Sequence, residues 1–360
     1  MSEFTGPDGT RKVVHEVPES VIIVNESTPL ISQPGPITAA TQALTDHHHL
    51  RRGELIGLAL MTLSAVGFST MSLFVKLGGA RFPSFQIVFA RSVIQTFFGL
   101  IGCAILKMNP LGKPGIRGWL FIRGLAGTCG LACLFYSVTK LPLADATVVF
   151  FLGPTFTAIL ASIALGESFT FFDGVCASMC MFGVVLVSKP PFLFGPQEGA
   201  LVDEASDLGR LFAIFCALLG AIMSAISYVT VRKIGKGAHF MVHVVYFGAI
   251  ASILSPVGLL LLQEYTPLES LKDYGIMFVI GLSAFVGQCL LNQGLQLAPA
   301  GPATLMRMND VAFAFLIDIF IFHQFPDIFS VLGASIIVFM TTALGLHKWY
   351  MHTTAHRPSA

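Results

Sequence analysis

Long apolar runs with few charges fill most of this sequence, and they constrain its fold more than any other feature. A helix that crosses a bilayer needs about 20 predominantly apolar residues. Ten stretches meet this need, near residues 54–78, 84–106, 118–140, 142–165, 170–188, 210–231, 239–262, 274–297, 300–322 and 326–346. With 54% hydrophobic and 11% charged residues, the chain cannot cover the surface of a soluble domain. We therefore predict an all-α integral membrane protein with ten transmembrane helices, and we exclude a soluble enzyme.

The ten predicted helices divide into two groups of five around one long internal segment. The expected organisation is a disordered polar tail at 1–50, a first five-helix repeat at 51–189, a linker at 190–209, a second five-helix repeat at 210–348 and a short tail at 349–360. The first tail lacks the apolar core of a signal peptide, so the first helix is expected to direct membrane insertion.

Weak internal similarity relates the two groups. A shift of 156 residues aligns 141–168 with 297–324 without a gap and matches Leu141 with Leu297. This similarity indicates an internal duplication. Because five is an odd number, two five-helix units joined by one loop have opposite orientations in the membrane. Inverted repeats of this kind build many alternating-access transporters.

The distribution of Lys and Arg predicts how the helices are oriented. Twelve of these residues fall in loops and tails on the side of the two termini, and five fall on the other side, namely Arg81, Lys140, Lys189, Arg210 and Lys272. Because cytoplasmic loops carry the excess of Lys and Arg, both termini are expected to be cytoplasmic.

Several sequence strings resemble a known transporter family. RGLAGTCGLACLFYSVTKLPLADATVVFFLGPTF at 123–156, followed by LGE at 165–167, resembles the EamA-type repeat of the drug/metabolite transporter superfamily. KPPFLFG at 189–195 and AGPATLMRMNDVAFAF at 300–315 are similar to the member-G group of solute carrier family 35. The second half departs from the repeat, because His323-Gln324 stands where a Gly-Glu pair would recur. The resemblance implies a ten-helix carrier of organic anions or nucleotide-linked solutes.

Charged residues inside the predicted helices are the first candidates for a substrate site. Each costs about 2.5–3.5 kcal/mol to insert at a helix centre. Six lie well inside the helices: Lys76, Arg91, Arg123, Arg307, Asp310 and Asp318. Because the cations outnumber the acids, a cavity lined by these residues would attract an anion. Guanidinium groups suit carboxylate or phosphate because they donate hydrogen bonds in a planar fork.

Each cationic candidate also has a structural interpretation. Arg307 lies about 10 Å into its predicted helix at 1.5 Å per residue, where it either contacts substrate or pairs with Asp310. Arg91 and Arg123 either contact substrate or hold helices together. Lys76 either joins the site or extends to the lipid headgroups.

Acidic and neutral polar residues complete the set of candidates. Asp318 lies eleven residues after Arg307, so both project from almost the same face of the predicted helix. Asp310 and Asp318 are therefore candidates for ion pairing or proton coupling, and a hydrogen bond between helices is the alternative for Asp318. Four neutral residues can either contact substrate or join helices: Gln288, Asn292, Asn309 and Tyr228.

No metal, cofactor or nucleic acid is expected to bind. All seven cysteines lie in apolar runs, and the i,i+4 pairs Cys129/Cys133 and Cys176/Cys180 have no His or acidic ligand nearby in the sequence. A net charge of +1 with scattered basic residues excludes nucleic-acid binding. The sequence also has no P-loop and no nucleophile motif in a plausible setting, so ATP-driven transport and enzyme chemistry are not expected.

The N-terminal tail contains a candidate sorting signal. ESTPLI at 26–31 has acidic dileucine spacing, in which sorting adaptors would contact Glu26, Leu30 and Ile31. This motif favours an endolysosomal or plasma membrane location. Asn25 begins an overlapping glycosylation sequon, which would require the tail to be lumenal. The two signals cannot operate on one topology.

Three functions are compatible with these features. The first is a secondary transporter that moves a small organic anion, a di- or tricarboxylate such as citrate, by alternating access. The second is a membrane scaffold that does not transport and binds partner proteins. The third is a nucleotide-sugar antiporter.

Overall fold

The computed structural model describes the backbone of most of the chain. The described residues are 2–5, 11–14, 16–17, 20–21, 36–78, 81–141, 143–189, 193, 207–321, 323 and 328–354. Side chains are described for most of these residues from Arg52 to Tyr350. Contacts divide the chain into two units, Met1–Leu50 and Arg51–Ala360.

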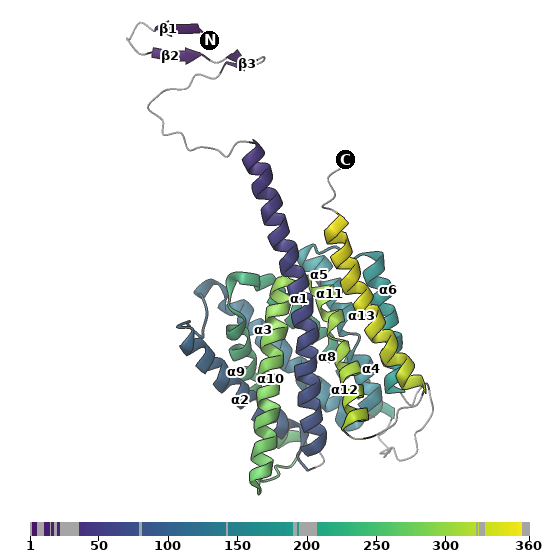
Figure 1. The fold of residues 1–360 in the computed structure, drawn as a ribbon. Helices are drawn as coiled ribbons and strands as arrows, with labels where there is room; N and C mark the ends of the chain where they lie inside the picture. The colour runs from purple at the N-terminus through teal and green to yellow at the C-terminus, as the bar shows by residue number, and fades with distance from the viewer. Residues whose placement is uncertain are drawn as a thin grey trace. The chain divides into compact units, whose positions relative to one another are not determined.

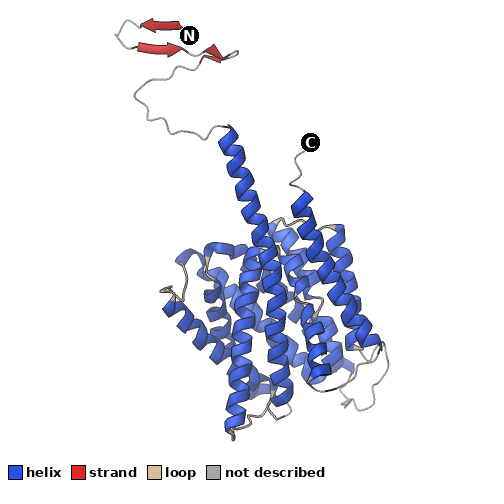
Figure 2. Ribbon diagram, in the orientation of Figure 1, coloured by secondary structure: helices blue, strands red, loops and turns tan. Residues whose placement is uncertain are grey.

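The first unit contains two short antiparallel strand pairs, drawn in red in Figure 2. Strand β1 (Ser2–Thr5) pairs with β2 (Arg11–Val14), and β3 (Glu16–Val17) pairs with β4 (Ser20–Val21). Helix α1 begins within the same unit, at Pro36. The predicted disordered tail did not include these elements, because strands of two to four residues leave almost no pattern in a polar sequence.

The second unit is helical wherever it has regular secondary structure in the described residues (Figures 1 and 2). Its elements are α1 (Pro36–Gly78, which starts in the first unit), α2 (Ser84–Ile105), η1 (Pro114–Ile116), α3 (Arg117–Lys140), α4 (Leu143–Phe150), α5 (Gly153–Leu165), α6 (Phe171–Ser188), α8 (Asp207–Ile234), η2 (Gly235–Gly237), α9 (Phe240–Leu262), α10 (Leu271–Leu297), α11 (Ala300–Met306), α12 (Asn309–Phe320) and α13 (Ile328–Thr354).

Nine helical segments of the described chain are long and apolar enough to cross a membrane. They are Arg52–Leu77, Ser84–Ile105, Pro114–Val138, Val148–Leu165, Phe171–Ser188, Leu211–Gly237, Phe240–Leu262, Leu271–Leu297 and Ile328–Tyr350. Each matches one of the ten stretches found in the sequence, which confirms the all-α membrane fold. The exception is 300–322, which is built from two shorter helices, so the count of ten stays a prediction.

A helix break occurs at the same point in both halves of the chain. Phe151 and Leu152 separate α4 from α5, and Arg307 and Met308 separate α11 from α12. The shift of 156 residues that aligned the two sequences also places the first break on the second. The positions of the two helix breaks therefore follow the same internal duplication that the weak sequence identity indicated.

The two breaks have different local causes. Pro154, near the start of α5, has no backbone N–H and its ring would clash with the carbonyl four residues earlier. In the second half the backbone tightens, and the Asp310 N–H donates to the carbonyl of Arg307 at 3.0 Å, three residues back. The Asn309 side chain also donates to the Met306 carbonyl at 2.9 Å. The single continuous helix predicted over 300–322 is therefore wrong, because side-chain and i−3 bonds replace its central turn.

Close backbone contacts hold neighbouring helices together. A Cβ atom on Gly130 of α3 would lie 2.9 Å from the carbonyl oxygen of Gly220 on α8. A Cβ atom on Gly183 of α6 would lie 2.7 Å from the carbonyl oxygen of Gly333 on α13, and these two helices lie side by side in Figure 1. Small residues permit this approach, which is how helices commonly associate within a bilayer.

Large apolar side chains point away from the helix contacts. Phe171, Leu260 and Ile163 are 90%, 82% and 78% exposed. Apolar groups exposed in such numbers suit a lipid solvent, since lipid tails solvate them and water does not.

Candidate functional site

Three arginines from different helices form a cluster, which we call the arginine cluster. Arg91 lies on α2, Arg123 on α3 and Arg307 at the break between α11 and α12. The guanidinium carbons of Arg123 and Arg91 lie 4.9 Å and 6.0 Å from the ring centroid of Phe247 on α9. Arg91 and Arg123 are 4% and 1% exposed. Two buried cations therefore share one aromatic ring, whose face attracts positive charge.

Amide side chains of α10 hold Arg123 in position. Its Nη2 atom donates to the side-chain oxygens of Gln288 at 3.0 Å and Asn292 at 2.9 Å. The Ser227 hydroxyl on α8 donates to the backbone carbonyl of Arg123 at 3.1 Å. Nε and Nη1 of Arg123 find no acceptor among the described residues. The guanidinium is thus fixed at one end, and its other N–H groups are unpartnered.

Arg91 has even fewer polar partners. Its Nη1 lies 3.5 Å from the sulfur of Met71, a weak acceptor, and its buried Nε finds no acceptor in the described part of the chain. Arg307 lies close enough for its charge to repel that of Arg91. A buried cation is costly unless it is paired and hydrogen-bonded. An anion bound here would therefore lower the free-energy cost of burying Arg91.

Arg307 and Asp310 have separate partners. Arg307 donates to the Tyr228 hydroxyl, and its guanidinium carbon lies 4.4 Å from the ring centroid of Phe68. The Ser69 hydroxyl donates to Asp310 Oδ1 at 2.6 Å. No ion pair joins Arg307 to Asp310 in the described residues, although their charges interact. The structural alternative for Arg307, a direct pair with Asp310, therefore has no contact to support it.

The remaining sequence candidates lie in other settings. The Asn309 side chain accepts from Thr341 at 3.0 Å and donates within its own helix break, so its amide is already engaged. Lys76 is exposed in the last turn of α1. Asp318 lies on α12, but its side chain is outside the described residues, as is the sorting motif Glu26, Leu30 and Ile31. The prediction that Arg307 and Asp318 share one helix face assumed a continuous helix. The helix is interrupted at Arg307, so this assumption does not hold.

An ion pair links three helices at one end of the bundle, which we call the Glu167 end. Glu167 Oε1 lies 2.7 Å from Arg232 Nε, and Oε2 accepts from the Ala300 N–H at 2.8 Å. Arg232 also donates to the Gln296 carbonyl at 3.0 Å. The LGE string marked Glu167 in the sequence, but its partner at the end of α8 had no signal.

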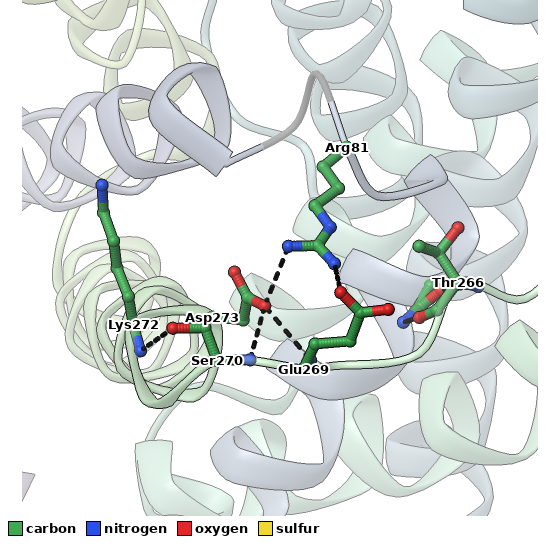
Figure 3. Close-up of polar contacts among 7 residues, drawn as sticks. Arg81, Thr266, Glu269, Ser270, Lys272 and Asp273 are labelled. Atoms are coloured by element: carbon green, nitrogen blue, oxygen red, sulfur yellow. Dashed lines mark hydrogen bonds and ion pairs between the residues drawn. The ribbon is translucent and has the colours of Figure 1, made fainter.

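A second charged group lies where the α1–α2 turn meets the α9–α10 turn, shown in Figure 3. Arg81 forms ion pairs with Glu269 and Asp273, and Gln86 exchanges hydrogen bonds with the backbone of Thr266. Arg81 and Glu269 have side chains that are 44% and 67% exposed, so this contact is far more solvated than the pair at the Glu167 end.

Sequence analysis missed the aromatic residues of the site. Phe247 and Phe68 each lie under a guanidinium, yet nothing separates them from the other phenylalanines, which number 32 in all. It also missed His243, one turn before Phe247 on α9 and 0% exposed.

Comparison with known proteins agrees with this architecture. A family model described as the EamA-like transporter family matches residues 55–189 and 211–344, one match in each half. The chain belongs to the EamA-like transporter family. It is therefore a multi-pass membrane transporter, whose environment is a lipid bilayer and whose substrate is a small molecule, and the family indicates transport rather than catalysis.

Individual relatives support the same assignment. Human solute carrier family 35 member G1 is 33% identical over 300 residues, which cover 82% of this chain and 80% of the human protein. The pseudopaline exporter CntI of Pseudomonas aeruginosa is 26% identical, covering 81% of this chain and 96% of the exporter. The resemblance to the member-G group is thus confirmed.

A solved crystal structure has the same fold. It superposes with a TM-score of 0.66 at 17% sequence identity, and the match covers 81% of this chain and 98% of that one.

Proposed function

We propose that this transporter carries a small organic anion, a di- or tricarboxylate such as citrate, and that the anion binds at the arginine cluster. The observation that carries the proposal is the pair of buried guanidiniums at Phe247, whose Nε atoms and one Nη find no acceptor among the described residues. Carboxylates accept hydrogen bonds from such groups in a bidentate manner. Two arginines on one ring suit an anion with more than one carboxylate.

The paired helix breaks support an alternating-access mechanism. Arg307 lies at the break in the second half, and Phe151 occupies the same place in the first. Discontinuous helices place backbone polar groups and helix ends near the membrane centre, where transporters bind their substrates. Each half therefore has a helix break, and only the break in the second half carries a cationic side chain.

Two other functions are compatible with the same fold. A non-transporting scaffold would use the same fold without moving a solute. A nucleotide-sugar antiporter would exchange nucleotide monophosphates, whose phosphates also suit guanidinium groups. Uncompensated cations inside the bundle favour an anion carrier over a scaffold, since a scaffold gains nothing from their insertion cost.

Counterflow in proteoliposomes tests the proposal. We expect labelled citrate to enter proteoliposomes that are preloaded with unlabelled citrate. It should not enter vesicles that contain no protein. Arg123→Lys should reduce counterflow strongly, because the charge remains but the planar fork is lost. Arg117→Lys, at the half-buried first residue of the same helix, is the matched control and should transport normally. No counterflow of any anion would favour the scaffold, and exchange of nucleotide monophosphates alone would favour the antiporter.

A double-mutant cycle tests the role of Arg307. Arg307→Ala should abolish citrate uptake and Arg307→Lys should retain part of it. If Arg307 instead serves Asp310, then Arg307→Ala should destabilise the protein and Arg307→Ala with Asp310→Ala should restore both melting temperature and uptake. Restored uptake in the double mutant would remove Arg307 from the substrate site.

We also propose that both termini are cytoplasmic and that sorting adaptors bind Glu26, Leu30 and Ile31, which would place the transporter in endolysosomal or plasma membranes. The excess of Lys and Arg on one side supports the orientation.

A further inference from the structure

A buried histidine lies beside the arginine cluster and has no role in the proposed anion site. His243 is 0% exposed and lies on α9, one turn before Phe247. Burial disfavours a positive charge on its ring most, and the charge of Arg123 adds to that effect. A fully buried titratable ring next to an unpaired cation is costly to charge, so its position needs an explanation.

Hydrogen bonds assign the proton on this ring. Gln296 Nε2 donates to the Ala238 carbonyl at 2.8 Å, which fixes the orientation of the amide. The same nitrogen lies 3.2 Å from His243 Nε2. Because an amide nitrogen only donates, Nε2 of the ring must accept, and the proton of the neutral ring is on Nδ1. That buried Nδ1–H finds no acceptor among the described residues.

Two ionisable groups act on His243, Arg123 on α3 and His239 on its own helix. Of these, Arg123 carries the charge that repels a second positive charge. Partial burial lowers the pKa of His239 below its usual range, so that ring stays neutral at pH 7. From α10 the ring faces the uncharged Gln296, and α2 contributes the amide of Gln95, which donates to the carbonyl of the next residue, Val244, at 3.2 Å. With the anion site empty, His243 has a cation nearby and no described acid to balance a proton.

We propose that His243 binds the proton that this carrier moves together with its anion, an inference that rests on the proposed function. An anion at Arg123 removes the charge repulsion against an imidazolium and attracts its positive charge, which offsets part of the cost of charging the buried ring, so the ring gains a proton at Nε2. Binding of the anion and binding of the proton then strengthen each other by the same factor, because such coupling is reciprocal. In the wild-type protein each anion therefore moves across the membrane together with one proton.

Protonation also changes a side-chain hydrogen bond of Gln296, a residue whose backbone contacts the Glu167 end. A proton on Nε2 cannot face the amide nitrogen of Gln296, so the amide must turn its oxygen to the ring and release the Ala238 carbonyl. The backbone carbonyl of Gln296 accepts from Arg232, the partner of Glu167. The same residue thus connects the proton site to the ion pair that joins three helices.

Proteoliposomes with the membrane potential clamped to zero test the coupling with labelled citrate. The wild-type protein should accumulate citrate against its gradient when the outside is acidic, by up to about tenfold per pH unit for one proton per anion. His243→Asn should lose this accumulation. It should still perform counterflow at saturating citrate, because the arginines remain, but it should need a higher citrate concentration, because binding of the proton no longer strengthens binding of the anion. His239→Asn is the matched control, since asparagine also caps a helix start, and it should accumulate citrate as the wild type does.

The outcomes separate this proposal from the function on which it rests. Wild-type counterflow without pH-driven accumulation, or normal accumulation by His243→Asn, overturns the role of His243 and leaves the transporter assignment intact. Absence of wild-type counterflow overturns both. Nitrogen NMR of histidine-labelled wild-type protein in detergent provides a measurement that needs no variant. Saturating citrate should convert one ring from the neutral Nδ1–H form to imidazolium, and an unchanged spectrum overturns the proposal.

Discussion

The guanidinium carbon of Arg123 lies 4.9 Å from the ring centroid of Phe247, and the two residues come from different membrane-spanning helices. The same ring lies 6.0 Å from Arg91, so one aromatic side chain supports two buried cations. A desolvated cation–π contact stabilises by about 2 kcal/mol. Phe247 therefore helps to position both guanidiniums, together with the amides that bind Arg123, although it bears no charge.

Replacing this ring should weaken anion binding. We expect Phe247→Leu to raise the citrate concentration needed for half-maximal counterflow by about 5- to 30-fold, equivalent to about 1–2 kcal/mol. Phe97→Leu on α2 is the control, because that ring is 60% exposed and contacts no arginine in the described residues. Equal concentration dependence in the two variants would contradict the arrangement.

The ion pair at the Glu167 end should contribute more stability than the one at Arg81. Glu167 and Arg232 are 17% and 27% exposed, and the same carboxylate caps Ala300. Hydrogen bonds to charged groups contribute about 1.5–3 kcal/mol, so Glu167→Gln should lower the melting temperature in detergent by several degrees. Glu269→Gln removes a carboxylate that is 67% exposed and should cost less than about 1 kcal/mol. If the two variants have the same melting temperature, Glu167 does not stabilise the contact between these helices.

The sequence predicted the helices well and their interruptions poorly. Runs of 20 apolar residues have a physical length that matches the bilayer, so nine spans could be found from composition alone. The break at Arg307 depends on i−3 backbone bonds and on the Asn309 side chain, neither of which has a composition signal. Pro154 offered a signal for the break in the first half, where the predicted stretch 142–165 passes through it.

The candidate site was predictable in its charges and not in its partners. Intramembrane arginines are rare enough to identify directly, and all three lie in one cluster. Gln288 and Asn292 were expected to line a cavity or join helices, and they hold Arg123 across two helices. Which phenylalanine lies under a guanidinium depends on tertiary packing, which a single sequence does not contain.

Helix packing at Gly130 should be sensitive to any side chain. A Cβ atom there would lie 2.7 Å from Ser224 Oγ and 2.9 Å from the Gly220 carbonyl oxygen. Gly130→Val should therefore destabilise the protein by about 1–3 kcal/mol through overpacking, measured as a lower melting temperature in detergent. Gly118→Ala, on the same helix with open space around it, should melt at the wild-type temperature or slightly above. A tolerated Gly130→Val would show that α3 and α8 are further apart.

Sorting by the tail should be separable from folding. Leu30→Ala with Ile31→Ala is expected to move the protein from endolysosomal membranes toward the plasma membrane, as measured by surface labelling. The melting temperature should not change, because the spans lie at Arg52 and beyond. An unchanged distribution would remove ESTPLI as a sorting signal.

Orientation in the membrane follows from the twelve-to-five distribution of Lys and Arg. An epitope at residue 20 and one at residue 355 should both react with antibody only after the membrane is permeabilised. Ten spans place both termini on one side, whereas nine would place them on opposite sides, so the two epitopes also test whether the broken helix at 300–322 crosses the bilayer. Reaction of one epitope in intact cells would indicate an odd number of spans. Glycosylation of native Asn25 would contradict a cytoplasmic tail in any compartment, because the modification occurs only in the lumen.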